Sequence, residues 1–369
     1  MKKILYITDR EEYSEHNFIG PLFEKYLSEY LQVDIVYFSK YKSYLGQKDR
    51  CLIIPEFKKK NMFECLKDND INISSYDCII VRNMHDVLKY VLENKNKYNI
   101  KVGFRLSFPK ITGELERAKA ENRSNLVKVI NHKLRTYSKL QLINQCDIFL
   151  PTSKQMQEVY YPNVKTKIFV IPSAIDPQRL HDKVSRNDKK IVFAYEGTLS
   201  KLRNFEVVLE AFCTIKKDNW ELHISTKDME YAKEYVKSCN LNQDKIKISK
   251  AATKDELLDF ITRCDVGLSL LPDISIFNTS VHLKIMDYYT SGVPSLMSNN
   301  AQNSSIFIDE KDAWLCDFNV KAISQKLEKI IDTPKSKIRA MGKAGQERLL
   351  DVRNYKIIAK KLSNALNEI

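Results

Sequence analysis

Several features that would assign a sequence to a specialised class are scarce or missing here. The 369 residues include only 9 glycines and 10 prolines, which excludes collagen-like and linker-dominated architectures. No apolar run approaches the roughly 20 residues of a membrane-spanning helix. The amino-terminal run KKILYIT is interrupted by charges too soon to be a signal peptide. These absences favour a folded, cytoplasmic protein.

The cysteines show no pattern of metal binding or disulfide bonding. The 8 cysteines are scattered without a CxxC pair, and the 6 histidines form no cluster at metal-ligand spacing. Several cysteines stand inside apolar runs such as YDCIIV. We therefore expect reduced, buried thiols.

Positive charge is in excess and unevenly distributed. The formal net charge of +13 favours an anionic partner, for which nucleic acid, anionic lipid and phosphorylated small molecules are the candidates. Residues 1–185 hold 31 of the basic and 22 of the acidic residues. Residues 101–140 combine ten basic and three acidic residues with the apolar residues Phe104, Phe108, Leu115, Leu126, Val127 and Val129. This basic segment suits an anionic membrane or a phosphate-bearing substrate, and a solvated helix face over core residues is the alternative.

Short apolar runs alternate with amphipathic runs along the whole chain. The runs KILYIT, VDIVYF and DCIIVR are continuous and apolar, as in a parallel sheet that is covered on both faces. The alternation predicts a doubly wound α/β fold. Because the polar stretch 177–189 interrupts the pattern, we predict two Rossmann-like domains over 1–185 and 186–352. A cleft at the carboxyl ends of both sheets is the expected ligand site.

The stretch FNTSVHLKIMDYYTSGVPSLMS (277–298) carries the clearest site pattern. Thr279 and Ser280 are N-cap residue types that stand just before a helical run. A helix that begins near Val281 would direct unpaired N–H groups and the positive end of its dipole towards a diphosphate. Asp287 lies further along this helix and would accept hydrogen bonds from the ribose hydroxyls of a nucleotide. A solvated surface acid is the alternative for Asp287.

This stretch resembles the signature of the GT-B retaining glycosyltransferases, specifically the family 4-like group, or glycosyl transferases group 1. In that signature an acid is followed after seven residues by a second acid and a helix that ends in Gly-x-Pro. Asp287 matches the second acid, whereas Thr279 stands at the position of the first acid, which usually contacts the transferred sugar. The resemblance implies that Thr279 and Ser280 bind the donor sugar or phosphate.

A second match is YEGTLSKLRNFEVVLEAF, which resembles the opening of the family's donor domain. There the family has Gly-Arg-Leu and, after three residues, Lys-Gly, and its two cations neutralise the donor diphosphate. Gly197 matches the glycine, a threonine replaces the first cation, and Arg203 keeps the second. Lys201 or Lys284 would restore the missing charge. A solvated loop lysine is the alternative for Lys201.

The resemblance extends over most of the chain. The loop at Ala251 corresponds to the loop whose backbone reads the nucleotide base, and residues 353–369 correspond to a closing helix that packs back on the first domain. Gly20 stands where the family often has a Gly-Gly turn near the donor phosphates, although a simple turn glycine is the alternative. His85 would hydrogen-bond the donor sugar or the acceptor hydroxyl, with a structural or solvated histidine as the alternative. Other charged residues at predicted strand ends are Asp9, Arg10, Arg82 and Arg105.

The resemblance implies a cytoplasmic glycosyltransferase of bacterial type, working at the inner face of the membrane. It would move a sugar with retention from a nucleotide-diphosphate sugar to a glycan or polyprenyl-linked acceptor in surface polysaccharide assembly. His85, Arg203 and Lys284 would act at the reacting groups. Because the leaving diphosphate takes the acceptor proton in a front-face mechanism, we expect no metal and no cofactor besides the donor substrate. The alternatives are an inactive GT-B-fold scaffold subunit, a nucleic-acid binder and a sugar-nucleotide epimerase.

Overall fold

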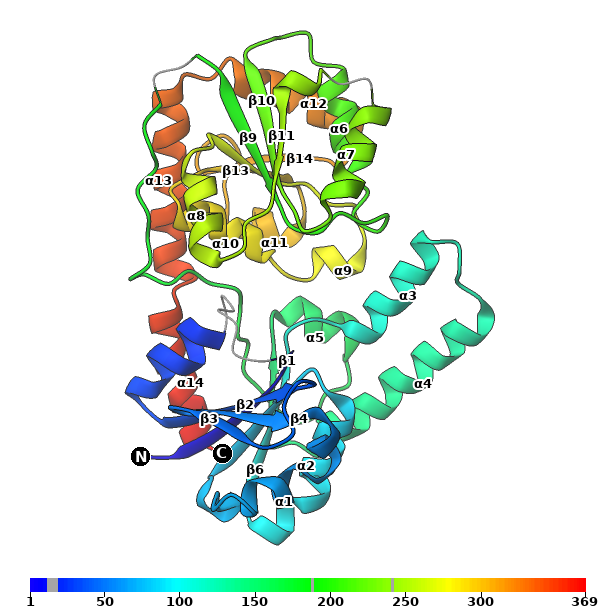
Figure 1. Cartoon of the computed structure of the whole chain (residues 1–369), viewed down its shortest axis with the longest axis vertical. Helices are drawn as coiled ribbons and strands as arrows, with labels where there is room; N and C mark the ends of the chain where they lie inside the picture. The colour runs from blue at the N-terminus through cyan, green and yellow to red at the C-terminus, as the bar shows by residue number, and fades with distance from the viewer. Residues whose placement is uncertain (12–18, 187–188, 240–241) are drawn as a thin grey trace. The chain divides into compact units, whose positions relative to one another are not determined.

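The computed structural model describes residues 1–11, 19–186, 189–239 and 242–369. The chain divides into two compact units, and Figure 1 labels most of their helices and strands. Unit 1 comprises Met1–Lys119, Arg123–Pro172 and Tyr355–Ile369, and unit 2 comprises Ala120–Asn122 and Ser173–Asn354.

Unit 1 is built on an eight-stranded sheet in the order β3-β4-β2-β1-β5-β6-β7-β8. All neighbouring strands are parallel except β3 and β4. The strands are β1 (Lys3–Glu11), β2 (Gln32–Ser39), β3 (Gly46–Lys48), β4 (Cys51–Pro55), β5 (Cys78–Arg82), β6 (Lys101–Leu106), β7 (Ile148–Pro151) and β8 (Lys167–Ile168). The α-helices are α1 (Met62–Lys67), α2 (His85–Tyr98), α3 (Lys110–Ala120), α4 (Leu126–Ile143), α5 (Lys154–Tyr160) and α14 (Tyr355–Asn367). A π-helix, η1 (Ile19–Tyr26), and the 3₁₀ turns η2 (Leu27–Glu29), η3 (Glu56–Asn61) and η4 (Ile73–Ser75) complete the unit.

The apolar strands of unit 1 are covered on both faces, as their sequences predict. On one face, Leu5 and Ile7 of β1 belong to a core that includes Leu88 of α2. On the other face, Tyr6 stacks on Phe23 of η1 with ring centroids 3.8 Å apart. Successive residues of a strand point to opposite faces, so a continuous apolar run such as ILYI needs both covers.

Unit 2 is built on a six-stranded, wholly parallel sheet in the order β11-β10-β9-β12-β13-β14. The strands are β9 (Ile191–Glu196), β10 (Trp220–Ser225), β11 (Ile246–Ser249), β12 (Val266–Ser269), β13 (Ser295–Ser298) and β14 (Trp314–Cys316). The helical segments are α6 (Glu206–Cys213), α7 (Met229–Ser238), η5 (Gln243–Lys245), α8 (Lys254–Thr262), α9 (Ser275–Asn278), α10 (Leu283–Thr290), α11 (Ala301–Ser304), α12 (Val320–Ile331) and α13 (Lys335–Val352). The predicted fold of two doubly wound α/β domains is confirmed.

Helix α10 is held from both sides by close contacts at glycines. At Gly267 of β12 a Cβ atom would overlap the Tyr288 ring, and the Tyr288 hydroxyl reaches the Ala194 and Leu268 carbonyl oxygens at 3.2 and 3.1 Å. At Gly345 of α13 a Cβ atom would overlap the Tyr289 ring. Helix α10 is therefore fixed between the sheet and α13.

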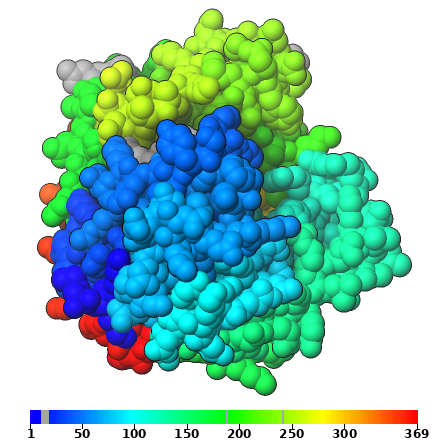
Figure 2. Space-filling view, turned by 60° about the horizontal axis from the view of Figure 1, so that its bottom comes forward, coloured from blue at the N-terminus to red at the C-terminus, as the bar shows by residue number. Residues whose placement is uncertain are grey.

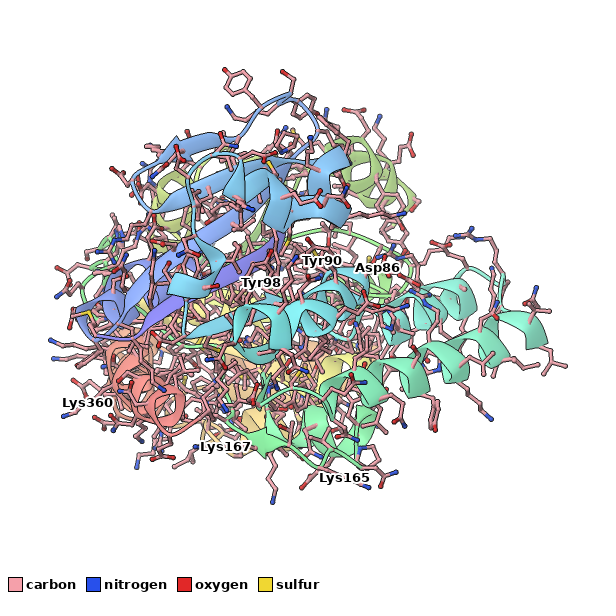
Figure 3. The ribbon with its side chains drawn as sticks, turned by 90° about the horizontal axis from the view of Figure 1, so that it is seen from below. Asp86, Tyr90, Tyr98, Lys165, Lys167 and Lys360 are labelled. Atoms are coloured by element: carbon pink, nitrogen blue, oxygen red, sulfur yellow. The ribbon has the colours of Figure 1, made fainter. Side chains whose placement is uncertain are left out.

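The carboxyl-terminal helix α14 belongs to unit 1, where it packs against η1 and η2. Lys2 Nζ donates a hydrogen bond to the Leu366 carbonyl oxygen at 3.0 Å. Figure 3 labels Lys360 on α14 and Lys167 on β8, whose Nζ pairs with Glu368 Oε2 at 2.6 Å. The end of the chain is thus tied both to its beginning and to the edge strand of the sheet.

The stretch 177–189, expected as a linker, is bonded to unit 2 over the part that the structure describes; residues 187–188 lie outside the described residues. His181 N–H donates to the Thr290 carbonyl oxygen at 2.9 Å. Lys183 Nζ pairs with Asp265 Oδ1 at 2.9 Å, and both side chains are buried. This polar composition reflects hydrogen bonding within unit 2, whose main segment begins at Ser173.

The basic segment 101–140 forms β6 and the helices α3 and α4, which stand out from the side of unit 1 in Figure 2. Five apolar side chains of α4 are between 47% and 73% exposed: Leu126, Val127, Ile130, Leu134 and Tyr137. Their spacing of three to four residues places most of them on one side of the helix. We call this set the α4 apolar stripe.

Other residues of the basic segment lie in the interior. Phe104 and Leu115 are buried, and so are the cations Arg105 and Lys139. For these four residues the burial fits the alternative of a helix face over core residues, because Arg105 donates to the Leu150 and Ile171 carbonyl oxygens and the apolar pair packs in the core. No helix in the described ranges has the length and apolar character to cross a bilayer.

The eight cysteines are free thiols. Six are buried: Cys51, Cys65, Cys78, Cys146, Cys264 and Cys316. The cysteine of YDCIIV, Cys78, is among them, as expected, whereas Cys213 is exposed and Cys239 is half-buried.

Candidate functional site

The strand order of unit 2 reverses between β9 and β12, and ligands of doubly wound sheets bind at the carboxyl ends of the strands on either side of such a reversal. Strand β9 ends at Glu196, and Gly197 follows with a φ of +117°. A Cβ atom at Gly197 would lie 3.9 Å from Lys284 Nζ and 4.0 Å from Arg203 Nη1. Cations from two separate segments of the chain therefore approach the same point at the end of β9.

Lys284 is a buried cation without a hydrogen bond. Its Nζ finds no hydrogen-bond partner among the described residues and lies 4.1 Å from the centroid of the Tyr195 ring. Burial lowers the pKa of Lys284, the charge of Arg203 lowers it further, and Glu196 opposes the shift. A buried ammonium group is costly unless an acceptor satisfies it, so this position suits an anionic ligand.

Asp287 lies three residues after Lys284 on α10, and the two therefore share a face of the helix. Its Oδ2 atom is 2.6 Å from Lys254 Nζ at the start of α8. Asp287 is 7% exposed, which excludes the alternative of a solvated surface acid.

Glu196 adds a second carboxyl group beside Asp287. Burial raises the pKa of Glu196, and the charge and a hydrogen bond of Asp287 raise it further, against the opposing charges of Lys254 and Lys284. Two carboxyl groups in contact cannot both ionise easily, so Glu196 keeps its proton at a pH where an ordinary glutamate has lost it.

The helix expected to begin near Val281 begins at Leu283 instead. Its N-cap residue is His282, whose side chain makes no capping hydrogen bond and whose ring lies 2.8 Å from the Phe277 carbonyl oxygen. Thr279 is buried as the C-cap residue of α9, and Ser280 is half-buried. Val281 is buried in an apolar cluster with Ile285, which delays the helix start.

The remaining residues singled out from the sequence lie in different places. Lys201 is exposed in the turn before α6, which fits the alternative of a solvated loop lysine. Ala251 is half-buried in the loop between β11 and α8. Gly20 lies in η1 and His85 begins α2, and both belong to unit 1. His85 Nε2 lies 3.1 Å from Ser138 Oγ of α4.

The sequence did not indicate two of the residues that lie beside Asp287, namely Glu196 and Lys254. Glu196 is a charged residue at the end of the apolar run IVFAYE, next to Gly197, which matched a family motif. This position could have indicated a site residue. Lys254 follows Thr253, which caps α8 by accepting a hydrogen bond from Glu256 N–H. Nothing in the sequence around Lys254 indicates that it pairs with Asp287.

No group of three or more His, Cys, Asp or Glu side chains could hold a metal ion within the part of the chain that the structure describes. The expectation that the donor binds without a metal stays a prediction.

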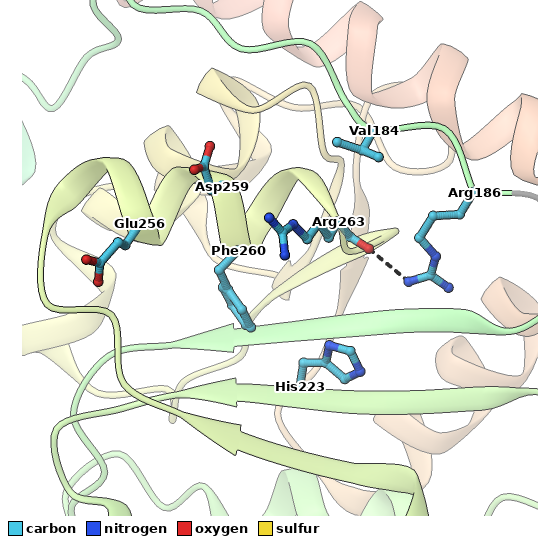
Figure 4. A pocket seen from close by; sticks show the side chains of 7 residues that line it. All are labelled: Val184, Arg186, His223, Glu256, Asp259, Phe260 and Arg263. Atoms are coloured by element: carbon cyan, nitrogen blue, oxygen red, sulfur yellow. Dashed lines mark hydrogen bonds between the residues drawn. The ribbon is translucent and has the colours of Figure 1, made fainter.

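A separate cavity of about 600 Å³ lies elsewhere in unit 2, and Figure 4 shows its lining. Arg186 Nη1 donates to the Arg263 carbonyl oxygen at 2.8 Å across one side of it. Its other lining residues are Val184, His223, Glu256, Asp259 and Phe260. None of the residues predicted to bind the donor lines this cavity.

Part of the chain matches a known protein family, and the whole chain is similar to solved structures. The model of the family described as glycosyl transferases group 1 matches residues 176–348. The comparison with curated proteins gave no match. Similar solved structures include sucrose-phosphate synthase from Thermosynechococcus elongatus, with 14% identity, a TM-score of 0.77 and coverage of 100% of this chain and 99% of that chain. Anabaena HepE in complex with UDP and glucose is similar with 11% identity, a TM-score of 0.70 and full coverage of both chains (100% each).

A third similar structure is an α,α-trehalose 6-phosphate synthase from Burkholderia multivorans, with 10% identity, a TM-score of 0.69 and coverage of 100% and 99%. At identities this low, the structural similarity establishes the fold alone. The family match covers most of unit 2. The chain therefore has the GT-B fold, and its residues 176–348 match the model of the glycosyl transferases group 1 family.

Proposed function

We propose that this chain moves a sugar, with retention, from a nucleotide-diphosphate sugar to a glycan or lipid-linked glycan acceptor in bacterial surface polysaccharide assembly. The convergence of Lys284 Nζ and Arg203 Nη1 on Gly197 carries the proposal. The two cations would bind the donor diphosphate and stabilise the negative charge that develops as it leaves. Positive φ at Gly197 lets the backbone approach the phosphates without a side chain in between.

Asp287 would bind the ribose of the donor. It matches the second acid of the family signature, and its carboxylate pairs with Lys254 Nζ at 2.6 Å beside Glu196, whose pKa is raised. Ribose hydroxyls would join Lys254 around this carboxylate. Thr279 and Ser280 would contact the donor sugar or phosphate, Ala251 the base, and the N–H groups at the start of α10 the diphosphate.

The similar structures suggest which donor to test first. The Anabaena HepE structures contain UDP or UDP-glucose. A uridine-diphosphate sugar is therefore the first candidate for this chain. Retention follows from the family resemblance and is tested by the anomeric configuration of the product, read by NMR of the newly formed linkage.

The decisive experiment compares donor binding in two variants. Arg203→Ala removes one phosphate cation, and Asp287→Asn keeps the shape of the side chain while it removes the charge. We expect both to weaken the binding of UDP and of UDP-sugars by tenfold or more, the loss expected for a hydrogen bond to a charged group, about 1.5–3 kcal/mol. Thermal-shift titrations against UDP, GDP, CDP and their sugars give the affinities. Unchanged nucleotide affinity in both variants would contradict the site assignment.

An inactive GT-B-fold subunit is the second candidate, because Thr279 replaces the acid that usually contacts the transferred sugar. Such a subunit would bind nucleotide but release none from a nucleotide sugar. Incubation with a panel of nucleotide sugars, with and without lipid-linked acceptor, separates the two functions by the nucleotide released.

We also propose that unit 1 contacts the inner face of an anionic membrane through α3 and α4. The α4 apolar stripe lies on the same helix as Lys128, Lys133 and Arg135, which are exposed. An exposed apolar side of a helix among basic residues is typical of helices that lie in the interface of anionic lipid.

A further inference from the structure

Unit 1 has its own polar cavity, next to the carboxyl end of β5. The cavity has a volume of about 320 Å³ and is lined by residues of η3, α2, α3 and α4 and by the residues that follow β5. Its charged lining residues are Lys59, Lys110, Arg135 and Lys139 against Asp86 and Glu114, and His85 lies beside them. The sheet order of unit 1 reverses between β1 and β5, so the cavity lies where doubly wound sheets bind ligands.

Lys139 is the most unusual residue of this lining. It is 4% exposed, and its Nζ donates to the Asn83 carbonyl oxygen at 3.2 Å and lies 5.3 Å from the Phe104 ring centroid. No carboxylate pairs with Lys139 among the described residues. One backbone carbonyl uses one of the three N–H donors of an ammonium group. The buried charge of Lys139 is therefore incompletely balanced by the protein.

Two of the other cations already have carboxylate partners. Arg135 pairs with Glu114 at 2.5 Å, and Lys110 pairs with Asp9, which also pairs with Arg82. Lys59 lies over the Phe38 ring at 5.1 Å and has no acidic partner among the described residues. The cavity thus has two cations, Lys59 and Lys139, that face it without a carboxylate.

The beginning of α2 adds hydrogen-bond donors to the same cavity. No side chain caps this helix, whose 14 residues start at His85, and His85 and Asp86 both line the cavity. The first N–H groups of a helix have no partner within the helix and favour anions.

We propose that the cavity of unit 1 binds a phosphate group carried by the acceptor, with Lys139 and Lys59 as its charged ligands. This inference rests on the proposed function, since it names the acceptor class of that transferase. A phosphate ester supplies the oxygens that both lysines and the α2 N–H groups lack. The phosphate belongs either to a soluble sugar phosphate or to a lipid-linked diphosphate, and the two sources share this chemistry.

The test measures anion binding at unit 1 while the donor site is disabled. Full-length protein carrying Lys284→Met is titrated by calorimetry with inorganic pyrophosphate, glucose 6-phosphate and farnesyl diphosphate. We expect Lys139→Met, which keeps the apolar stem over Phe104, to weaken binding of all three by about tenfold or more, and Lys139→Arg to restore part of it. Lys59→Met should weaken binding as well, and Lys165→Met, at an exposed lysine of the same unit, should not.

The pH dependence of binding is a readout that a merely structural lysine would not give. Burial lowers the pKa of Lys139 to about 8, and Lys110 and Arg135 lower it against the opposing charges of Asp9 and Glu114. Phosphate affinity should therefore fall as the pH rises through this value, and it should not do so with Lys139→Arg, which stays charged. His85 also lines the cavity, and His85→Gln shows whether its ring contributes to binding.

Each outcome decides the proposal. Equal affinity of Lys139→Met and Lys59→Met with the parent protein, or no binding of any phosphate compound, overturns it. Loss of binding in both variants supports it, and tighter binding of farnesyl diphosphate than of pyrophosphate assigns the lipid-linked source. If the protein binds no nucleotide sugar, the proposed function fails, whereas these titrations still report on the cavity.

Discussion

At the scale of single residues, Lys284 is the side chain whose protonation we expect to respond to a ligand at the proposed donor site. In the protein alone its ammonium group is buried near Arg203 and has no hydrogen bond to a described residue, so its pKa is lowered. A diphosphate beside it would favour the charged form and raise the pKa again. Ligand binding at this site is therefore coupled to protonation.

We predict that donor binding takes up protons at neutral to mildly alkaline pH. Calorimetric titration of UDP in Tris and in HEPES, whose ionisation enthalpies differ, measures the number of protons taken up per bound nucleotide. Uptake of up to one proton is expected, and Lys284→Arg should remove it because arginine stays protonated at every accessible pH. Lys311→Met, at an exposed lysine of unit 2, is the control and should behave as the parent protein. Identical heats in the two buffers would show that Lys284 is already charged in the free protein.

Glu196 gives a second prediction at this scale, on stability. Its pKa is raised above the ordinary value of 4.5, so the folded state holds the proton more tightly than the unfolded chain. Its contribution to stability is then complete below pH 4.5 and is lost as the pH rises towards the higher folded pKa. Glu196→Gln mimics the protonated acid and should raise the free energy of unfolding at pH 9 relative to pH 5.

The measurement for Glu196→Gln is urea unfolding at the two pH values. The gain at pH 9 should exceed the effect at pH 5 by at least about 1.4 kcal/mol, the equivalent of one pKa unit. Glu221→Gln is a useful contrast, because the lysines and the histidine that donate to Glu221 lower its pKa to about 2 and its loss should destabilise the protein at neutral pH. The same pH dependence in parent and Glu196→Gln proteins would mean that Glu196 ionises normally.

At the scale of elements, the placement of α10 between β12 and α13 sets the position of Lys284 and Asp287. The helix cannot move towards α13, because Tyr289 already lies on Gly345. It cannot move towards the sheet, because Tyr288 already lies on Gly267. Lys284 and Asp287 are therefore positioned by two glycines, Gly267 and Gly345, that pack against the aromatic rings of α10.

We predict that Gly345→Ala destabilises unit 2 by about 1–3 kcal/mol, the usual cost of overpacking a close contact. The added methyl group would meet the Tyr289 ring and force α13 and α10 apart. Chemical unfolding followed by tryptophan fluorescence is suitable, since Trp220 and Trp314 both lie in unit 2. Ala344→Gly in the same helix controls for helix propensity. A Gly345→Ala protein as stable as the parent would contradict the close packing of α10.

The sequence predicted the elements of this fold well because continuous apolar strands and amphipathic helices alternate on both sides of the polar stretch 177–189. It misplaced the start of α10 because Thr279 and Ser280 look like capping residues, whereas the short helix α9 ends on Thr279. Val281 is buried in a cluster that also contains distant residues such as Ile175 and Leu349, which no local pattern reports. The pairing of Lys254 with Asp287 was invisible for the same reason, since it joins two helices.

At the scale of the whole molecule, the net charge of +13 no longer requires a single anionic partner. The two proposed sites would account for part of it, with Lys284 and Arg203 in unit 2 and Lys139 and Lys59 in unit 1. The exposed cations of α3 and α4 form a third region and have an apolar stripe beside them.

We predict that the full-length protein sediments with vesicles of phosphatidylcholine and phosphatidylglycerol but not with phosphatidylcholine alone. The double variant Ile130→Gln with Leu134→Gln should lower the bound fraction by about tenfold in partition coefficient, since each side chain loses about 1 kcal/mol or more of apolar burial. Val159→Gln, at an exposed valine of α5, is the matched control. Binding that is insensitive to both salt and the double variant would contradict a docking role for α4.

The connectivity of the two units has a consequence for how the chain is made. The main segment of unit 2, Ser173–Asn354, is inserted between two parts of unit 1, and its ends are joined by a hydrogen bond from Ile175 N–H to the Arg353 carbonyl oxygen at 2.8 Å. On the ribosome, unit 2 therefore emerges complete before unit 1 receives α14, which packs on η1. Unit 1 begins to be translated first but receives its last helix only at the end of synthesis. Until then, the surface of η1 that α14 covers lacks this helix in the nascent chain.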